Sequence, residues 1–183
     1  MKWKSLIVIL PYFVLFMVII GIACNDDDDD DDNGGAVYTD SSNGLTWQLE
    51  PTEEPLSWFD AGDYCAELIY DGHDDWRLPT ISELRGLVRG CPNTETGGDC
   101  AVTDSCLSKD ECWDLPCTGC PISEGPAGGC YWPEIFGSEC HYYWSSSPVE
   151  ENEDKIWHVD MCSGYVSYCD RDRDSDPHVI CVR

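Results

Sequence analysis

Cysteine is the residue type that could do the most chemistry in this chain, which has 183 residues and 13 cysteines. Paired cysteines form disulfides in an oxidising compartment, whereas cysteines of cytosolic proteins more often bind metal or carry out redox chemistry. Twelve of them follow residue 64: Cys65, Cys91, Cys100, Cys106, Cys112, Cys117, Cys120, Cys130, Cys140, Cys162, Cys169 and Cys181. This even number predicts six disulfides, provided that the thirteenth cysteine, Cys24, has another role.

Zinc binding is the alternative use of these thiols. Cys117 and Cys120 form a C-x-x-C pair, a spacing common in zinc sites. The sequence has no second well-spaced pair with partner histidines, and export favours oxidation. We therefore expect disulfides.

The segment 170–176 carries aspartate at every second position and could bind calcium through Asp170, Asp172 and Asp174. The spacing is that of the opening of an EF-hand loop, but Ser175 stands where that loop needs glycine and Cys181 where it needs glutamate. The alternative is a solvated loop in which the intervening arginines offset the carboxylates. Calcium is the single cofactor that the sequence suggests.

Two aromatic segments could contact a ligand. In the run Tyr-Tyr-Trp-Ser-Ser-Ser at 142–147, Trp144 could stack on a sugar while Ser145 and Ser146 supply hydroxyls. The alternative is a strand whose alternation buries Trp144. Arg77, between Trp76 and Leu78, could likewise orient a ligand, but pairing with a nearby carboxylate explains it as well.

Catalytic motifs are missing from the sequence. The four histidines fit no nucleophile or metal pattern, and there is no G-x-S-x-G, H-E-x-x-H or glycine-rich phosphate loop. Lysine and arginine number 10 against 36 aspartates and glutamates, a net charge of -26, which excludes a role in binding nucleic acid. We expect a protein that is not an enzyme.

The first 23 residues are typical of an export signal, with a basic start followed by a long apolar stretch. Residues 21–24, Gly-Ile-Ala-Cys, resemble the lipobox of bacterial lipoproteins, except that glycine replaces the usual leucine. Residues 1–23 are thus predicted to be a lipoprotein signal peptide, and Cys24 to carry the lipid that attaches the protein to a membrane. An uncleaved membrane anchor and an ordinary cleaved signal are the alternatives.

Residues 24–35 are predicted to be the lipidated cysteine and an acidic tether. Seven consecutive aspartates, 26–32, repel one another and favour an extended, solvated chain. Asn25, rather than aspartate, follows Cys24, which favours the outer membrane or cell surface in lipoprotein sorting.

The folded part, residues 36–183, must position these candidate residues. Asn43-Gly44 predicts the turn of a hairpin over residues 37–47. Ser57 predicts the start of a helix that ends near Gly72, and a capping box of Thr80 and Glu83 starts a second helix that ends near Gly90. Residues 91–140, rich in cysteine, glycine and proline, have no periodicity and are predicted to be an irregular insertion held by disulfides instead of a core.

The C-terminal third is predicted to be strands. Residues 156–161 and 166–168 alternate around Ser163-Gly164, and a two-residue turn there would place Met161 opposite Val166. In that register Cys162 and Cys169 lie about 13 Å apart and cannot pair with each other. Each should instead bond to the insertion, and a last strand is expected at 179–182.

Five motifs occur in an order similar to that of the Lcl C-terminal domain family of bacterial surface modules. They are Gly-Leu-Thr-Trp-Gln (44–48), the segment 58–68, Asp-Trp-Arg-Leu-Pro-Thr-Ile-Ser-Glu-Leu (75–84), Tyr-Trp-Ser-Ser-Ser (143–147) and Val-Ile-Cys-Val-Arg (179–183). The resemblance covers about residues 36–183. It implies an α+β, C-type-lectin-like fold with two short helices packed on a small antiparallel sheet.

The resemblance also implies a disulfide between Cys65 and Cys181, because such folds commonly join the first helix to the last strand. The other ten cysteines would then form five bridges within and onto the insertion. It further implies a lectin-like domain that binds an extracellular ligand, such as a glycan or a surface protein, through the insertion and the 170–177 loop. Sulfated polysaccharide is disfavoured by the acidity of the chain. The alternatives are a structural envelope lipoprotein without a specific ligand and an enzyme related in fold to formylglycine-generating enzymes.

Overall fold

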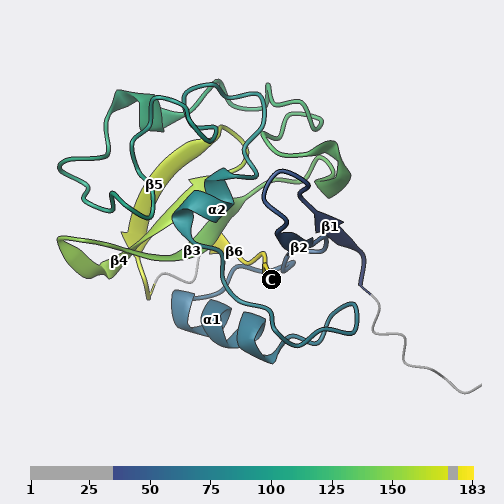
Figure 1. Ribbon diagram of the computed structural model, residues 1–183. Helices are drawn as coiled ribbons and strands as arrows, with labels where there is room; N and C mark the ends of the chain where they lie inside the picture. The colour runs from purple at the N-terminus through teal and green to yellow at the C-terminus, as the bar shows by residue number, and fades with distance from the viewer. Residues whose placement is uncertain (1–34, 173–176) are drawn as a thin grey trace, which may run out of the picture. The chain divides into compact units, whose positions relative to one another are not determined.

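The computed structural model in Figure 1 describes residues 35–172 and 177–183. Residues 1–34, with the predicted signal, Cys24 and the acidic tether, lie outside the described residues. The strands are β1 (Val37–Thr39), β2 (Thr46–Gln48), β3 (Tyr142–Val149), β4 (Asn152–Asp160), β5 (Tyr165–Asp170) and β6 (Pro177–His178). The helices are α1 (Trp58–Glu67) and α2 (Ile81–Arg85), with 3₁₀ turns at Leu115–Thr118 and Glu134–Phe136. The α+β fold class is as predicted.

The main sheet has four strands in the order β5-β4-β3-β6, and β1 and β2 form a separate hairpin. The sheet is mixed, because β6 runs parallel to β3 while the other pairs are antiparallel. The expected last strand at 179–182 is only partly present. The chain pairs as β6 and then continues as an extended segment, in which the Val182 amide donates to the Arg77 carbonyl at 2.9 Å and the Arg183 amide to the Thr46 carbonyl at 2.9 Å.

Both helices begin where their caps predict and end earlier than predicted. The Ser57 hydroxyl accepts from the Asp60 amide, and Thr80 and Glu83 form a complete capping box. The first helix stops at Glu67 because Leu68 turns into an extended conformation. None of the helices in the described part of the chain is long and apolar enough to cross a membrane.

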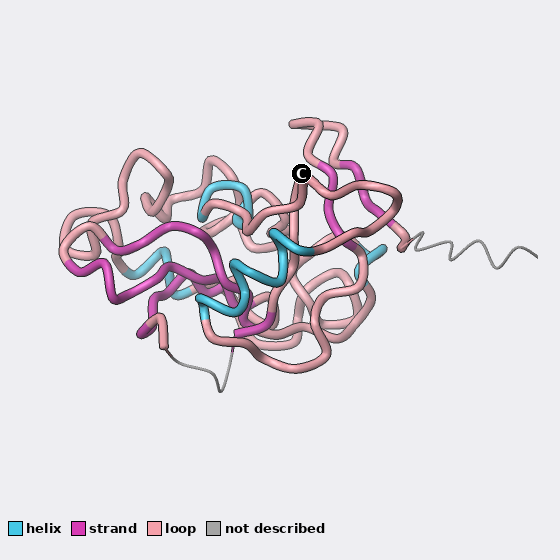
Figure 2. Tube along the Cα trace, turned by 90° about the horizontal axis from the view of Figure 1, so that it is seen from below, coloured by secondary structure: helices cyan, strands magenta, loops and turns pink. Residues whose placement is uncertain are grey.

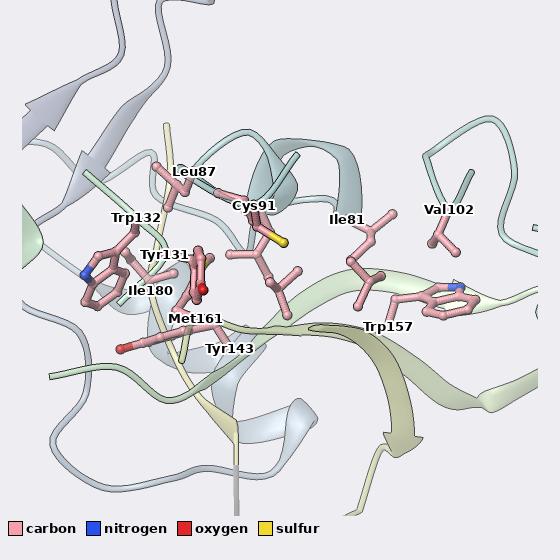
Figure 3. Packing of buried hydrophobic residues seen from close by; sticks show 14 of the residues in the cluster. Ile81, Leu87, Cys91, Val102, Tyr131, Trp132, Tyr143, Trp157, Met161 and Ile180 are labelled. Carbon is pink, nitrogen blue, oxygen red and sulfur yellow. The ribbon is translucent and has the colours of Figure 1, made fainter. Parts of the chain in front are cut away.

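The two faces of the sheet are buried against different elements. One face contributes Tyr143, Trp157 and Val159 to a large cluster that also contains Ile81 from α2 and Trp132 from the insertion. Figure 3 shows this cluster, with Trp132 and Tyr143 at one end and Trp157 and Val102 at the other. The opposite face contributes residues to a smaller cluster against α1: Trp144, Ile156 and Cys169 from the strands, with Ala61 and Cys65 from the helix.

Loops make up much of the trace in Figure 2, and by residue number the insertion at 91–140 is mostly loop, as predicted. The expectation that disulfides replace a core in it is wrong. Tyr131, Trp132 and Phe136 are buried in the large cluster, and so are several of its disulfides. Trp132 stacks on Phe136 with ring centroids 5.1 Å apart. The insertion is therefore both crosslinked and packed on the sheet.

The structure joins Cys65 to Cys181, the pair that the resemblance implies. Four further disulfides lie within the insertion: Cys91–Cys120, Cys100–Cys117, Cys106–Cys112 and Cys130–Cys140. Cys117 and Cys120 therefore bond to different partners, which leaves no C-x-x-C metal pair. Among the described residues no group of three or more histidine, cysteine, aspartate or glutamate side chains could hold a metal ion.

The expectation that Cys162 and Cys169 bond to the insertion is wrong, since both lie outside the five disulfides. The predicted hairpin register is shifted, with Val159 rather than Met161 opposite Val166. The turn has four residues instead of two because the Asp160 carboxylate accepts from the Cys162 amide at 2.8 Å and from the Ser163 hydroxyl at 2.6 Å. Cys162 forms no disulfide with the insertion, but its thiol donates a hydrogen bond to the Cys140 carbonyl at 2.8 Å.

Candidate functional site

The three residues proposed to contact a ligand in the Tyr-Trp-Ser-Ser-Ser motif lie in the scaffold. Trp144 and Ser145 are fully buried. The Trp144 indole donates to the Leu56 carbonyl at 2.8 Å, and the Ser145 hydroxyl donates to the Trp157 carbonyl at 2.6 Å. Ser146 donates from its hydroxyl to the Pro79 carbonyl at 3.2 Å. A ligand cannot reach Trp144 or Ser145, and the alternative of a buried strand describes this segment.

The candidate calcium ligands are only partly described, because Asp174 lies outside the described residues. Asp170 and Asp172 border a shallow hollow together with Asp154. Lys155 pairs with Asp170 at 2.7 Å and Arg171 pairs with Asp154 at 2.7 Å. Two of the carboxylates at this place are therefore already neutralised by cationic side chains.

Arg77 pairs with a carboxylate, which was the alternative to a role in orienting a ligand. Its guanidinium donates two hydrogen bonds, each of 2.7 Å, to Glu83 in the capping box of α2. This pairing raises the pKa of Arg77 and contributes to lowering that of Glu83 against the opposing effect of burial. Arg77 therefore fixes the start of α2.

A better candidate for a binding site is a hollow of about 320 Å³ on the face of the main sheet that α1 partly covers. We call it the sheet-face hollow. It is lined by side chains of β3, β4, β5 and β6: Tyr142, His158, Tyr165, Ser167, Tyr168, Cys169 and Pro177. Tyr142 is the most exposed aromatic residue in it, with 39% of its surface accessible.

Strand alternation explains why most of these residues share one face. Tyr168 is the exception, since it pairs with Trp157 and its ring packs on Trp157 on the opposite face. Tyr142 lies opposite Asp160, which lies opposite Tyr165, and His158 lies between Trp144 and Ser167. Neighbouring residues in register point to the same side of a sheet, and residues two apart along a strand do so as well. The sequence therefore places the hollow on the face opposite Trp157 and Val159.

The hollow combines ring surfaces with polar groups and contains no charged lining residue among the described side chains. The ring of His158 meets those of Tyr142 and Trp144 edge to face, at centroid distances of 5.5 Å and 6.2 Å. The tyrosine hydroxyls and the Ser167 hydroxyl can each donate and accept a hydrogen bond. This chemistry suits a neutral ligand that has both apolar faces and hydroxyl groups.

The sequence contains the alternation that forms this hollow, and the predicted register differs by two residues, which keeps each side chain on its face but gives it the wrong neighbour. A two-residue turn at Ser163-Gly164 places His158 opposite Cys169, whereas the structure places it opposite Ser167. Asp160 is the signal that could have identified the longer turn. Its carboxylate can accept hydrogen bonds from the Cys162 amide and the Ser163 hydroxyl, two and three residues further along the chain.

The fold and its crosslinks define a class of protein. A disulfide from the first helix to the end of the chain, four more in a packed insertion, and a mixed sheet with two short helices form a C-type-lectin-like module built for an oxidising environment.

The chain belongs to the Lcl C-terminal domain family, which matches residues 36–183. Membership of this family indicates a bacterial surface or secreted protein. No curated protein matches the chain.

Proposed function

We propose that this protein is a non-catalytic lipoprotein of the bacterial cell envelope whose sheet-face hollow binds a neutral extracellular glycan. The observation that carries the proposal is the lining of the hollow, which contains Tyr142, Tyr165 and Ser167 beside His158, whose ring meets that of Tyr142 edge to face. An aromatic ring offers an apolar surface to the C–H groups of a sugar, and the hydroxyls and imidazole can exchange hydrogen bonds with its hydroxyl groups.

The charge of the chain supports a neutral ligand over a sulfated one. The net charge is -26, and among the described residues no lysine or arginine lines the hollow. An anionic polysaccharide would be repelled unless a cation bridged it to the protein. Calcium at Asp170, Asp172 and Asp174 is the bridging ion that the sequence suggests, so glycan binding should be measured both with calcium and with a chelator.

The hollow is tested with a glycan array and calorimetry on the full chain. Binding of a neutral glycan should weaken about tenfold or more in Ser167→Ala and Tyr142→Ala, because each removes a lining group. Ile122→Ala is the control, since Ile122 is an apolar residue 72% exposed that lies outside both the hollow and the candidate calcium ligands. Equal affinity in the Ser167 and Tyr142 variants would reject the hollow as the site, and no bound glycan on the array would favour a structural envelope role.

The membrane attachment rests on the signal and lipobox pattern of residues 1–24. Mass spectrometry of the mature N-terminus should find acylated Cys24, and Cys24→Ser should release the protein from the outer membrane fraction. An unmodified Cys24, or retention of the full signal, would contradict lipid anchoring and leave the glycan proposal standing.

A further inference from the structure

Three cysteines meet where the end of the insertion lies beside the turn between β4 and β5. Cys130 and Cys140 are joined by a disulfide, and Cys162 is outside the five disulfides of the described residues. The Cys162 thiol donates to the Cys140 carbonyl at 2.8 Å. A thiol is therefore held beside a disulfide, and one member of that disulfide is its direct neighbour.

The register of the sheet explains why Cys140 and Cys162 are neighbours. β3 and β4 pair antiparallel, and just beyond the paired residues the Met161 amide donates to the His141 carbonyl at 3.0 Å. One more step in the same register places Cys140 opposite Cys162. Opposite residues of an antiparallel pair have Cα atoms about 4.5–5.5 Å apart, within the range of about 4.4–6.8 Å that a disulfide requires. Cys140 therefore has a second partner within bonding reach.

Hydrogen bonds hold Cys162 in this position. Its amide donates to the Asp160 carboxylate at 2.8 Å. The residue before it, Met161, accepts at its carbonyl from the Tyr131 amide at 2.7 Å, and Tyr131 directly follows Cys130 in the sequence. The backbone next to Cys162 thus contacts the segments of both cysteines of the disulfide.

The environment of the thiol keeps this disulfide intact near neutral pH. Burial, with the Asp160 carboxylate beside it, raises the pKa of the Cys162 thiol to about 12. Tyr143 interacts with the thiol from β3, and burial raises the pKa of its hydroxyl as well, so Tyr143 adds no charge at pH 7. The thiolate is the species that attacks a disulfide. Exchange is therefore slow while Cys162 is protonated.

We propose that Cys162 exchanges with the Cys130–Cys140 disulfide, so that the module has two crosslinked forms. The Cys162 thiolate attacks the Cys140 sulfur, and the Cys140–Cys162 bond forms as the Cys130–Cys140 bond breaks. The electron pair of the broken bond goes to the Cys130 sulfur, which takes up the proton that Cys162 lost. No oxidant or reductant is consumed, and the number of thiols is unchanged.

The two forms differ in what the crosslink holds. In the first, the disulfide closes the segment that carries Trp132 and Phe136. In the second, it joins the end of the insertion to the turn between β4 and β5 and releases that segment at Cys130. The exchange does not depend on glycan binding.

The test is disulfide mapping of the full chain by mass spectrometry after incubation at pH 7.5 and at pH 8.5 without added thiol. Acid quenching and digestion with pepsin at low pH prevent exchange during the analysis, since thiols are then protonated. We expect a Cys140–Cys162 peptide and a new thiol at Cys130. The peptide should form about tenfold faster at the higher pH, because the thiolate fraction rises about tenfold per pH unit below the pKa.

Three variants isolate the exchange. Cys130→Ser should trap the second form, with Cys140 joined to Cys162 without incubation. Cys162→Ser should keep the Cys130–Cys140 bond and yield no new pairing. Cys169→Ser is the matched control, because Cys169 is the other cysteine outside the five disulfides and belongs to the cluster on the opposite face of the sheet. It should exchange at the same rate as the unmodified sequence.

Three outcomes would overturn the proposal. The first is a Cys130→Ser variant in which Cys140 is not bonded to Cys162. The second is a chain of natural sequence that keeps only the Cys130–Cys140 bond after incubation at pH 8.5. The third is a Cys169→Ser variant in which exchange is lost as fully as in Cys162→Ser, which would indicate general scrambling through Cys169.

Discussion

Arg85, the last residue of α2, holds the start of the insertion by a buried guanidinium group. Only 3% of its surface is accessible. Its Nε donates to the Thr94 carbonyl at 3.1 Å and one Nη to the Glu95 carbonyl at 3.2 Å, while the other Nη donates to the Val102 carbonyl. None of these acceptors is a carboxylate, and burial lowers the pKa of Arg85. One side chain therefore satisfies backbone groups on both sides of the loop 94–102.

We predict that Arg85→Met destabilises the protein by about 3 kcal/mol. The methionine keeps much of the apolar stem but leaves three carbonyls without donors, two of them buried and the one of Glu95 partly buried, at a cost of about 1 kcal/mol each. The measurement is equilibrium unfolding in denaturant with the disulfides intact, where the midpoint should fall and the slope should stay constant.

Arg77→Met is the control for Arg85→Met. The Arg77 side chain is 48% exposed and pairs with Glu83 at the surface, so its loss should cost about 0.2–1 kcal/mol. If Arg85→Met were no more destabilising than Arg77→Met, the reasoning would be refuted, because the carbonyls of residues 94–102 would then not depend on the guanidinium.

Three further predictions follow from named contacts. Replacing Cys65 and Cys181 with serine should cost about 4–5 kcal/mol in denaturant unfolding, since the bridge spans 116 residues and restricts the unfolded chain; a loss below about 1 kcal/mol would contradict this. Hydrogen bonds from Ser108 and from the Lys109 and Asp110 amides lower the pKa of Glu151 to about 2, so the stabilisation that they give is complete above its ordinary value and is lost as pH falls through about 2. In an NMR titration the Lys109 amide should follow that midpoint, and a midpoint near 4.5 would show that the contacts are absent. Burial, with Asp160 beside it, raises the pKa of the Cys162 thiol to about 12. At pH 8 iodoacetamide should therefore alkylate Cys162 in the folded protein far more slowly than it alkylates the thiol of free glutathione. Unfolding the chain without reductant should remove this difference. Rapid alkylation of the folded protein would exclude this environment.

Local signals in the sequence predicted local structure well. Ser57 and Thr80 start their helices, because each cap depends on residues within a few positions. The β1–β2 hairpin forms where Asn43-Gly44 predicts it, although its loop spans residues 40–45 and is held by hydrogen bonds to Asp40. The helix ends were less predictable. Leu87 and Val88 continue the apolar pattern of α2 beyond its end at Arg85, since burial in the tertiary structure requires apolar residues whether or not they are helical.

Long-range partners could not be predicted from spacing. The four disulfides of the insertion depend on where packing places each cysteine, and eight cysteines leave too many pairings for the sequence to decide. The role of Arg85 could not be predicted for the same reason. Its hydrogen-bond acceptors are backbone carbonyls, which every residue carries, so no sequence pattern marks them. Residue type alone does not separate a ligand-binding aromatic side chain from a core one, and Trp144 is a core residue because its large ring is fully buried.

The position of the sheet-face hollow follows from the lengths of the elements that cover the sheet. A ten-residue helix such as α1 is about 15 Å long. The nine-residue strand β4 extends about 30 Å. In the smaller cluster α1 packs against Trp144, Ile156 and Cys169, whereas Tyr142 at the start of β3 stays 39% exposed. The insertion does not fill this gap, because its aromatic residues are packed on the opposite face. A loop-rich insertion would ordinarily be the first place to look for recognition. Here it stabilises one side of the sheet, and the sheet-face hollow lies on the other side.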